Sequence, residues 1–170
     1  MIKDDYGERA QLAHNMKSGA NWFYWIAGLS LITSILSLSG AGWRFFLSLG
    51  ITQVVDGISL AFRDQLGSAG LIIALALDIL IIAVFAALGY LAGRKQTWAF
   101  IVGMVLFFID ALLLLIGMDI FAILFHGLAL FYIFRGYQAA RDLVLREQLD
   151  EMQPPPPPPP QPAEAPSASV

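Results

Sequence analysis

Three ionisable side chains lie inside long apolar stretches of this sequence, namely Asp78, Asp110 and His126. Each lies about two helical turns from one end of its stretch, on the order of 10 Å deep. A charged side chain at the centre of a membrane costs about 2.5 to 3.5 kcal/mol on translocon-insertion scales, so these groups should point inward and pair. Ser34 reaches a similar depth in another apolar stretch. Together these four residues form a predicted buried polar layer.

Three kinds of chemistry are open to this layer. Its members could hydrogen-bond one another and hold helices together, with one aspartate protonated or paired to a histidinium. One histidine with two carboxylates is also a ligand set for a metal ion and a workable proton relay, although no short paired motif such as HxxxH supports a metal. The third reading is hydrolysis inside the membrane, with Ser34 as nucleophile, His126 as base and an aspartate orienting it.

The hydroxyls of one apolar stretch have a simpler explanation than catalysis. Ser30, Thr33, Ser34 and Ser37 follow helical spacing, and such hydroxyls commonly return hydrogen bonds to backbone carbonyls or to a neighbouring helix. We therefore assign no catalytic residue, and the sequence names no cofactor and leaves any metal unknown.

The composition is that of a membrane protein. Of 170 residues, 58% are hydrophobic and 14% charged, and the mean hydropathy is +0.69, well above the balance of soluble domains. The absence of cysteine excludes disulfides and thiolate sites. A formal charge of −3 without a basic stripe excludes a nucleic-acid partner.

Four apolar stretches are each about 20 residues long, the length that an α-helix needs to cross the hydrocarbon core. A fifth stretch, 43–65, has one apolar stripe but contains Gln53 and Asp56. We interpret it as an interfacial amphipathic helix, with a re-entrant segment or a fifth crossing as alternatives. The predicted fold is therefore an all-α integral membrane four-helix bundle, with the interfacial helix between its first and second spans. The predicted spans are residues 22–39, 71–92, 98–117 and 119–137.

The two ends of the chain are hydrophilic. Residues 1–20 are predicted to be a cytoplasmic segment with a short surface helix that ends near Ser18 and Gly19. Residues 138–152 should continue the last span as a cytoplasmic helical extension. Residues 153–170 are predicted to be a disordered proline-rich tail, because Pro154–Pro160 forms a polyproline II rod and the rest has nothing to bury.

The basic residues predict the orientation. With four spans, most of them share one side of the membrane and only Arg44 and Arg63 lie on the other, which indicates cytoplasmic termini. A fifth crossing would destroy this bias. The residues on the cytoplasmic side are Lys3, Arg9, Lys17, Arg94, Lys95, Arg135, Arg141 and Arg146.

Small residues predict where helices pack closely. Gly89 and Gly93 form a small-xxx-small pair on the helical face that also carries Asp78. Asp119, on the face of His126, and Asp56 are secondary candidates for the polar layer.

Three segments of the chain resemble small uncharacterised bacterial multi-pass membrane proteins of about four helices. They are NWFYWIAGLSLI (Asn21–Ile32), LGITQVVDG (Leu49–Gly57) and WAFIVGMVLFFIDALLLL (Trp98–Leu115). The resemblance covers most of residues 20 to 140. It implies the architecture and a bacterial cell membrane, and carries no known activity or site.

The function expected from these observations is that of a non-enzymatic scaffold or accessory subunit in the cell membrane. Its expected partners are the lipid bilayer, a second copy or other membrane subunits, and a cytoplasmic binder of Pro154–Pro160. The alternative is a proton- or metal-dependent membrane protein that uses Asp78, Asp110 and His126, for transport or for intramembrane hydrolysis.

Overall fold

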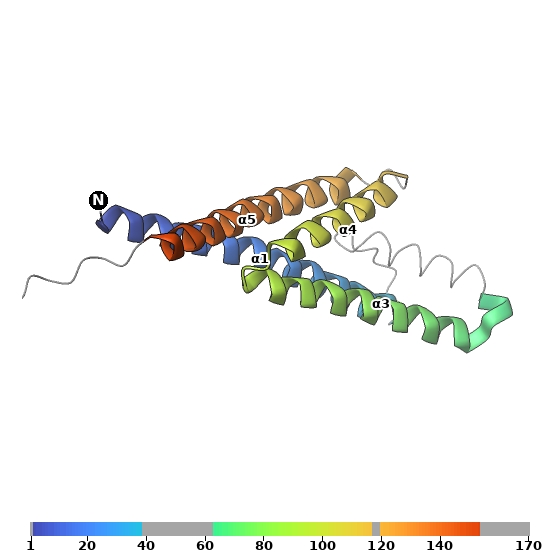
Figure 1. Cartoon of the computed structure of the whole chain (residues 1–170). Helices are drawn as coiled ribbons and strands as arrows, with labels where there is room; N and C mark the ends of the chain where they lie inside the picture. The colour runs from blue at the N-terminus through green and yellow to red at the C-terminus, as the bar shows by residue number, and fades with distance from the viewer. Residues whose placement is uncertain (1, 39–62, 117–119, 154–170) are drawn as a thin grey trace, which may run out of the picture.

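The structure is a computed structural model that describes residues 2–38, 63–116 and 120–153. Within these residues the chain is helical, which confirms the all-α fold class. Each of four helices contains a stretch long and apolar enough to cross a membrane. Figure 1 shows them as α1 (Ile2–Leu38), α3 (Arg63–Gly93), α4 (Thr97–Ile116) and α5 (Ile120–Met152).

Two predicted segments lie partly or wholly outside the described residues. Of the interfacial helix predicted at 43–65, residues 43–62 lie outside the described residues and residues 63–65 form the start of α3. This helix therefore begins at Arg63, earlier than the span predicted from residue 71. The proline-rich tail from residue 154 onward also lies outside the described part of the chain.

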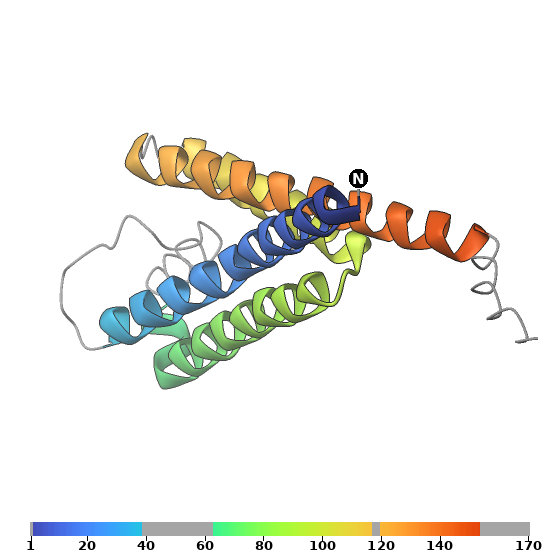
Figure 2. The same cartoon turned by 90° about the vertical axis from the view of Figure 1, so that its left-hand side faces the viewer.

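The four helices form a ring in which each packs mainly against two neighbours. α1 contacts α3 and α5, and α4 contacts the same two helices. α1 and α4 run in one direction and α3 and α5 in the other, so residues 2 and 152 lie at the same end of the molecule (Figures 1 and 2). We call this end the terminal end and the opposite one the far end. Toward the far end, the α1–α3 pair diverges from the α4–α5 pair.

α1 is one continuous helix through Ser18 and Gly19, where the sequence predicted a helix end. A glycine inside a helix costs about 1 kcal/mol relative to alanine, and here close packing explains its presence. A Cβ atom on Gly19 would lie 2.6 Å from the Cα of Gly136 in α5 and 3.0 Å from the carbonyl oxygen of Tyr132. The backbones of α1 and α5 thus touch directly, and neither glycine position has room for a side chain.

On the terminal side of this crossing, α1 and α5 continue together as a two-helix extension formed by residues 2–18 and 137–152. Its helices are joined by ion pairs. Arg9 donates two hydrogen bonds to the Asp150 carboxylate, at 2.7 and 3.1 Å. Arg146 donates to Glu8 at 2.7 Å, and Lys95, from the turn between α3 and α4, reaches Glu147.

The Arg9–Asp150 pair makes the extension sensitive to acid. Hydrogen bonds from Arg9, together with the charges of Arg9 and Arg146, lower the pKa of the Asp150 carboxyl below its ordinary value of 3.8. Because the folded-state pKa is the lower one, the contribution to stability is present above pH 3.8 and is lost as the pH falls through the folded-state pKa. The Asp150 side chain is exposed and that of Arg9 is half-buried, so solvent screens the pair and the contribution is small at neutral pH.

An aromatic cluster fills the centre of the bundle. The ring of Phe23 in α1 lies 6.4 Å from that of Phe85 and 6.1 Å from that of Phe100, and Phe85 meets Phe107 edge-on at 6.1 Å. Gly103 makes this possible, because a Cβ atom there would lie 2.3 Å from the Phe23 ring. Around these rings the buried residues are mostly small, which lets the helices approach closely. They include Ala20, Ala92, Ala99, Ala129, Ala139 and Ala140.

The α1–α5 crossing gives a direct test. We expect Gly136→Ala to lower the free energy of unfolding by about 1 to 3 kcal/mol, because the added methyl group meets backbone and forces the helices apart. Thermal unfolding in detergent measures this as a lower Tm.

Gly127→Ala is the matched control, since a Cβ on Gly127 of the same helix meets nothing within 4 Å in the described part of the chain. This variant should keep or raise the Tm, because alanine has the higher helix propensity. Equal Tm values for the two variants would contradict the close crossing.

Candidate functional site

Asp110 and His126 form a buried pair between α4 and α5. The His126 Nε2 atom lies 2.8 Å from Asp110 Oδ2, and the two residues are 1% and 3% exposed. The other ring nitrogen, Nδ1, lies 2.8 Å from the carbonyl oxygen of Ala122, one turn earlier in α5. A carbonyl oxygen can only accept, so Nδ1 carries a hydrogen and donates it. The ring orientation and tautomer are thereby set.

This tautomer fixes how many protons the pair shares. The bond between Nε2 and Oδ2 needs one proton, which lies either on a neutral carboxyl that donates to a neutral imidazole or on an imidazolium that donates to a carboxylate. Both forms have the same total charge. Moving the proton from the carboxyl to the imidazole converts a neutral pair into an ion pair without proton uptake. The hydrogen bond can therefore hold the two helices together or act as one step of a proton relay.

Aromatic rings enclose the His126 imidazole. The Phe107 ring stacks on it almost in parallel, with centroids 4.2 Å apart and planes at 12°. Phe125 meets it edge-on at 6.2 Å. Apolar rings lower the local dielectric response, which strengthens the hydrogen bond to Asp110 and makes loss of either partner costly.

Ser34 and Asp78 form a second contact, between α1 and α3. The Ser34 hydroxyl donates to Asp78 Oδ2 at 2.9 Å, and both residues are buried. The neighbouring Thr33 hydroxyl instead returns to its own helix, with the carbonyl oxygens of Leu29 and Ser30 each at 2.9 Å. Of the hydroxyl stripe predicted from sequence, Ser34 is thus the member that bridges to another helix among the described residues.

The structure joins the predicted layer in two interhelical contacts, Ser34 with Asp78 and Asp110 with His126. Among the described residues no group of three His, Asp or Glu side chains comes close enough to hold a metal ion. The hydroxyl of Ser34 donates to Asp78 and not to His126, so the Ser–His arrangement needed for a nucleophile is not formed. The two polar contacts are separate because the α1–α3 pair diverges from the α4–α5 pair toward the far end (Figure 2). The secondary candidates Asp56 and Asp119 lie outside the described residues.

The predicted packing glycines have different surroundings. A Cβ on Gly89 would lie 3.1 Å from Phe23 Cβ and 3.2 Å from the Tyr24 ring, so Gly89 supports contact with α1 within the chain. A Cβ on Gly93 would meet no atom of the described residues within 4 Å. This second glycine therefore borders open space and not a helix contact.

A comparison of the chain with protein-family models, with curated proteins and with solved structures gives no match. The function must be argued from the contacts of the chain itself.

Several contacting groups were missed from sequence. The Ala122 carbonyl and the Phe107 ring position His126, and Gly19 and Gly136 set the helix crossing. Helical spacing offers a signal for the first two, since Ala122 lies four residues before His126 and Phe107 three before Asp110. No such local signal marks the two glycines, because they pair across more than a hundred residues of sequence.

The Ser34–Asp78 contact gives a second test. We expect Ser34→Ala to lower the free energy of unfolding by about 0.6 to 1.7 kcal/mol, the average and the largest value measured for hydrogen bonds between membrane helices. Chemical or thermal unfolding in detergent measures the change.

Ser30→Ala, one turn earlier in α1, is the control. The Ser30 hydroxyl is fully buried and has no hydrogen-bond partner among the described residues, so its removal should be neutral or stabilising. A larger loss for Ser30→Ala than for Ser34→Ala would show that the bridging contact does not matter for stability.

Proposed function

We propose that this chain is a non-enzymatic membrane scaffold. Its four helices cross the cell membrane, and its terminal end holds a two-helix extension and a proline-rich tail at the cytoplasmic face. The observation that mainly supports the proposal is that α1 and α5 are longer than a membrane span and that ion pairs join their terminal ends.

The exposed surface of the apolar segments supports membrane crossing. Large apolar side chains face outward along all four helices, as expected where lipid and not water surrounds a bundle. Small residues fill the helix contacts, the pattern of membrane helix interfaces. The exposed side chains include Ile32, Ile35, Ile72, Leu80, Phe108, Ile109, Phe121 and Leu124.

The lengths of α1 and α5 support an extension outside the membrane. α1 has 37 residues and α5 has 33, so they are about 55 and 50 Å long at 1.5 Å per residue. The hydrocarbon core is only about 30 Å thick. The surplus of about 20 Å lies at the terminal end, where the ion pairs Arg9–Asp150 and Arg146–Glu8 hold the two helices together. A rigid, exposed pair of helices is a suitable platform for another protein.

The distribution of basic residues supports a cytoplasmic terminal end. Basic residues near the ends of spans stay on the cytoplasmic side. Most of the described basic residues gather at or near this end, on α1, α5 and the turn between α3 and α4, whereas Arg63 begins α3 at the far end. Those at the terminal end are Lys3, Arg9, Lys17, Arg94, Lys95, Arg135, Arg141 and Arg146.

The buried polar contacts support a role in holding the helices together. Ser34 and Asp78 link α1 to α3, and Asp110 and His126 link α4 to α5. Each contact therefore stabilises one helix pair at the depth where the two pairs diverge. In this role the groups add specificity to helix pairing and need no substrate.

The tail supplies the chemistry for a partner. Pro154–Pro160 follows the end of α5 almost directly, and a polyproline II segment is recognised by grooves lined with aromatic side chains. The proposed partner is thus a cytoplasmic protein with such a proline-binding groove.

Deletion of residues 154–170 tests the scaffold proposal. The wild-type chain, crosslinked in its native membranes and purified through an N-terminal tag, should retain a cytoplasmic partner that the deletion loses. Replacement of each proline in Pro154–Pro160 by serine keeps the length and should lose the partner too, because it removes the preformed polyproline II shape. Asp110→Asn is the control and should keep the partner. A partner retained by both tail variants would refute the role of the tail.

A second candidate function follows from the single proton shared by Asp110 and His126. A buried carboxyl–imidazole pair inside a bundle is one element of a proton pathway. In this candidate the chain carries protons across the membrane, and the pair must change its protonation in each cycle.

Asp110→Asn separates the two candidates. The asparagine amide can donate to Nε2, which keeps the helix contact, but it cannot lose a proton under these conditions. Proton flux into proteoliposomes, read by an internal pH-sensitive dye under an imposed potential, is the measurement. If the chain is a scaffold, vesicles with the wild type and vesicles with the variant should both show the same proton flux as vesicles without protein. A wild-type flux well above that level and abolished in Asp110→Asn would replace the scaffold with the proton-dependent function.

A further inference from the structure

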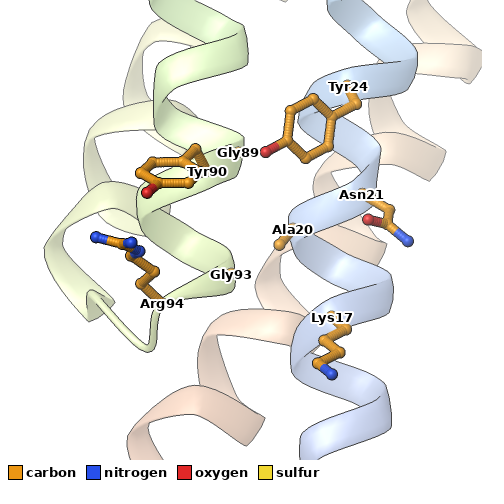
Figure 3. A pocket seen from close by; sticks show the side chains of 8 residues that line it. All are labelled: Lys17, Ala20, Asn21, Tyr24, Gly89, Tyr90, Gly93 and Arg94. Carbon is orange, nitrogen blue, oxygen red and sulfur yellow. The ribbon is translucent and has the colours of Figure 1, made fainter.

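A pocket of about 300 Å³ lies between α1 and α3 at the terminal end of the bundle. Figure 3 shows its small floor, which Ala20 contributes from α1 and Gly89 and Gly93 from α3. At Gly89 the floor is closed by Phe23 and Tyr24, whereas a Cβ on Gly93 would meet nothing within 4 Å among the residues that the structure describes. The pocket is therefore tight beside Gly89 and wider beside Gly93, one helical turn closer to the terminal end.

Two tyrosines stand on the helices that border the pocket. Tyr24 of α1 and Tyr90 of α3 are 44% and 51% exposed, and Figure 3 shows Tyr24 directed toward α3. Tyrosine at this position is typical of the headgroup region, where its ring is apolar and its hydroxyl can donate to a polar group.

Two cations border the wide end of the pocket, one from each side. Arg94 follows α3, with its Cζ atom 4.5 Å from the centre of the Tyr90 ring. Stacking uses the flat face of the guanidinium and leaves its edge N–H groups able to bind an oxyanion. Lys17 comes from α1, three residues before Ala20.

These two cations differ from others at the terminal end. Arg9, Lys95 and Arg146 form ion pairs with carboxylates of α1 or α5. Among the described residues neither Lys17 nor Arg94 forms such a pair, and no acidic residue lines the pocket. The pocket thus presents positive charge and several hydrogen-bond donors without a neutralising group.

From this arrangement we propose that the pocket binds the phosphate group of an anionic phospholipid. The apolar stretch of α3 that is long enough to cross a membrane ends at Gly93. Lys17 and Arg94 therefore lie at the depth of the lipid headgroups. Basic pockets between membrane helices on the cytoplasmic side suit anionic headgroups, whose leaflet also attracts such residues. The phosphate lies between Lys17 and Arg94, and the lipid chains follow the exposed apolar faces of α1 and α3.

This inference rests on the membrane crossing in the proposed function and not on the scaffold role. Resistance of the protein to carbonate extraction from membranes tests the crossing separately. A protein that is inserted but shows no lipid preference would overturn the pocket inference alone.

Native mass spectrometry of the delipidated full chain in neutral detergent is the central experiment. Phosphatidylglycerol and phosphatidylcholine with the same acyl chains are titrated in turn. The wild type should bind phosphatidylglycerol more tightly than phosphatidylcholine. Lys17→Gln and Arg94→Gln should each weaken phosphatidylglycerol binding about fivefold, and the double variant about 25-fold. Equal binding of the two lipids by the wild type, or an unchanged double variant, would overturn the proposal.

Two further variants distinguish the pocket from general surface charge. Arg141→Gln removes the same charge from an exposed position of α5 outside the pocket and should leave phosphatidylglycerol binding within about twofold of wild type. Gly93→Leu keeps every charge but fills the pocket in its open space, and should weaken binding as strongly as the loss of a cation. A loss in Arg141→Gln equal to that in Arg94→Gln, or full binding by Gly93→Leu, would refute a built site.

Free phosphate is the other source of the same ligand chemistry. The wild type in neutral detergent, without lipid, is heated with and without inorganic phosphate. A lipid site predicts no phosphate-dependent rise in Tm. A rise that disappears in the Lys17→Gln and Arg94→Gln double variant would overturn the lipid assignment in favour of a soluble phosphate ligand.

Discussion

The direct contact between the backbones of α1 and α5 is the constraint on which the rest of the structure depends. Gly19 and Gly136 meet so closely that no side chain fits between them. In lipid there is little hydrophobic force between helices, so such close packing supplies much of the association energy. The crossing also joins the two longest helices at one point. Beyond it toward the termini they are free to pair through charges, and beyond it in the other direction they separate toward α3 and α4.

This geometry explains why the buried polar groups form two contacts. Each contact lies within one helix pair, Ser34 with Asp78 and Asp110 with His126. A polar group in an apolar bundle must find a donor or acceptor nearby, and the nearest one lies on the adjacent helix. The aromatic cluster around Phe107 fills the space beside His126 and shields that contact from water. The result is two antiparallel helix pairs, each joined by its own polar contact.

The terminal end carries most of the described basic residues, in two different surroundings. Some of its basic residues are used to hold the extension together, as Arg9 does with Asp150 and Lys95 with Glu147. Others border the pocket between α1 and α3, as Lys17 and Arg94 do. The basic residues of this end thus have two surroundings, since some join helices through ion pairs and others border the pocket. The two groups of basic residues differ in whether a carboxylate of a neighbouring helix lies close enough to form an ion pair.

The sequence by itself determined the local properties of this protein. Four apolar stretches of sufficient length, the turn at Arg94 and Lys95 and the placement of Asp78, Asp110 and His126 on inward faces follow from periodicity and from the cost of polar groups in lipid. Only the tertiary structure decided which inward groups meet. It also decided that α1 continues through Gly19, because the loss of helix propensity there is offset by a contact with Gly136, far away in the chain. Helix spacing and depth are local quantities, whereas the angle between helix pairs depends on all the contacts at once.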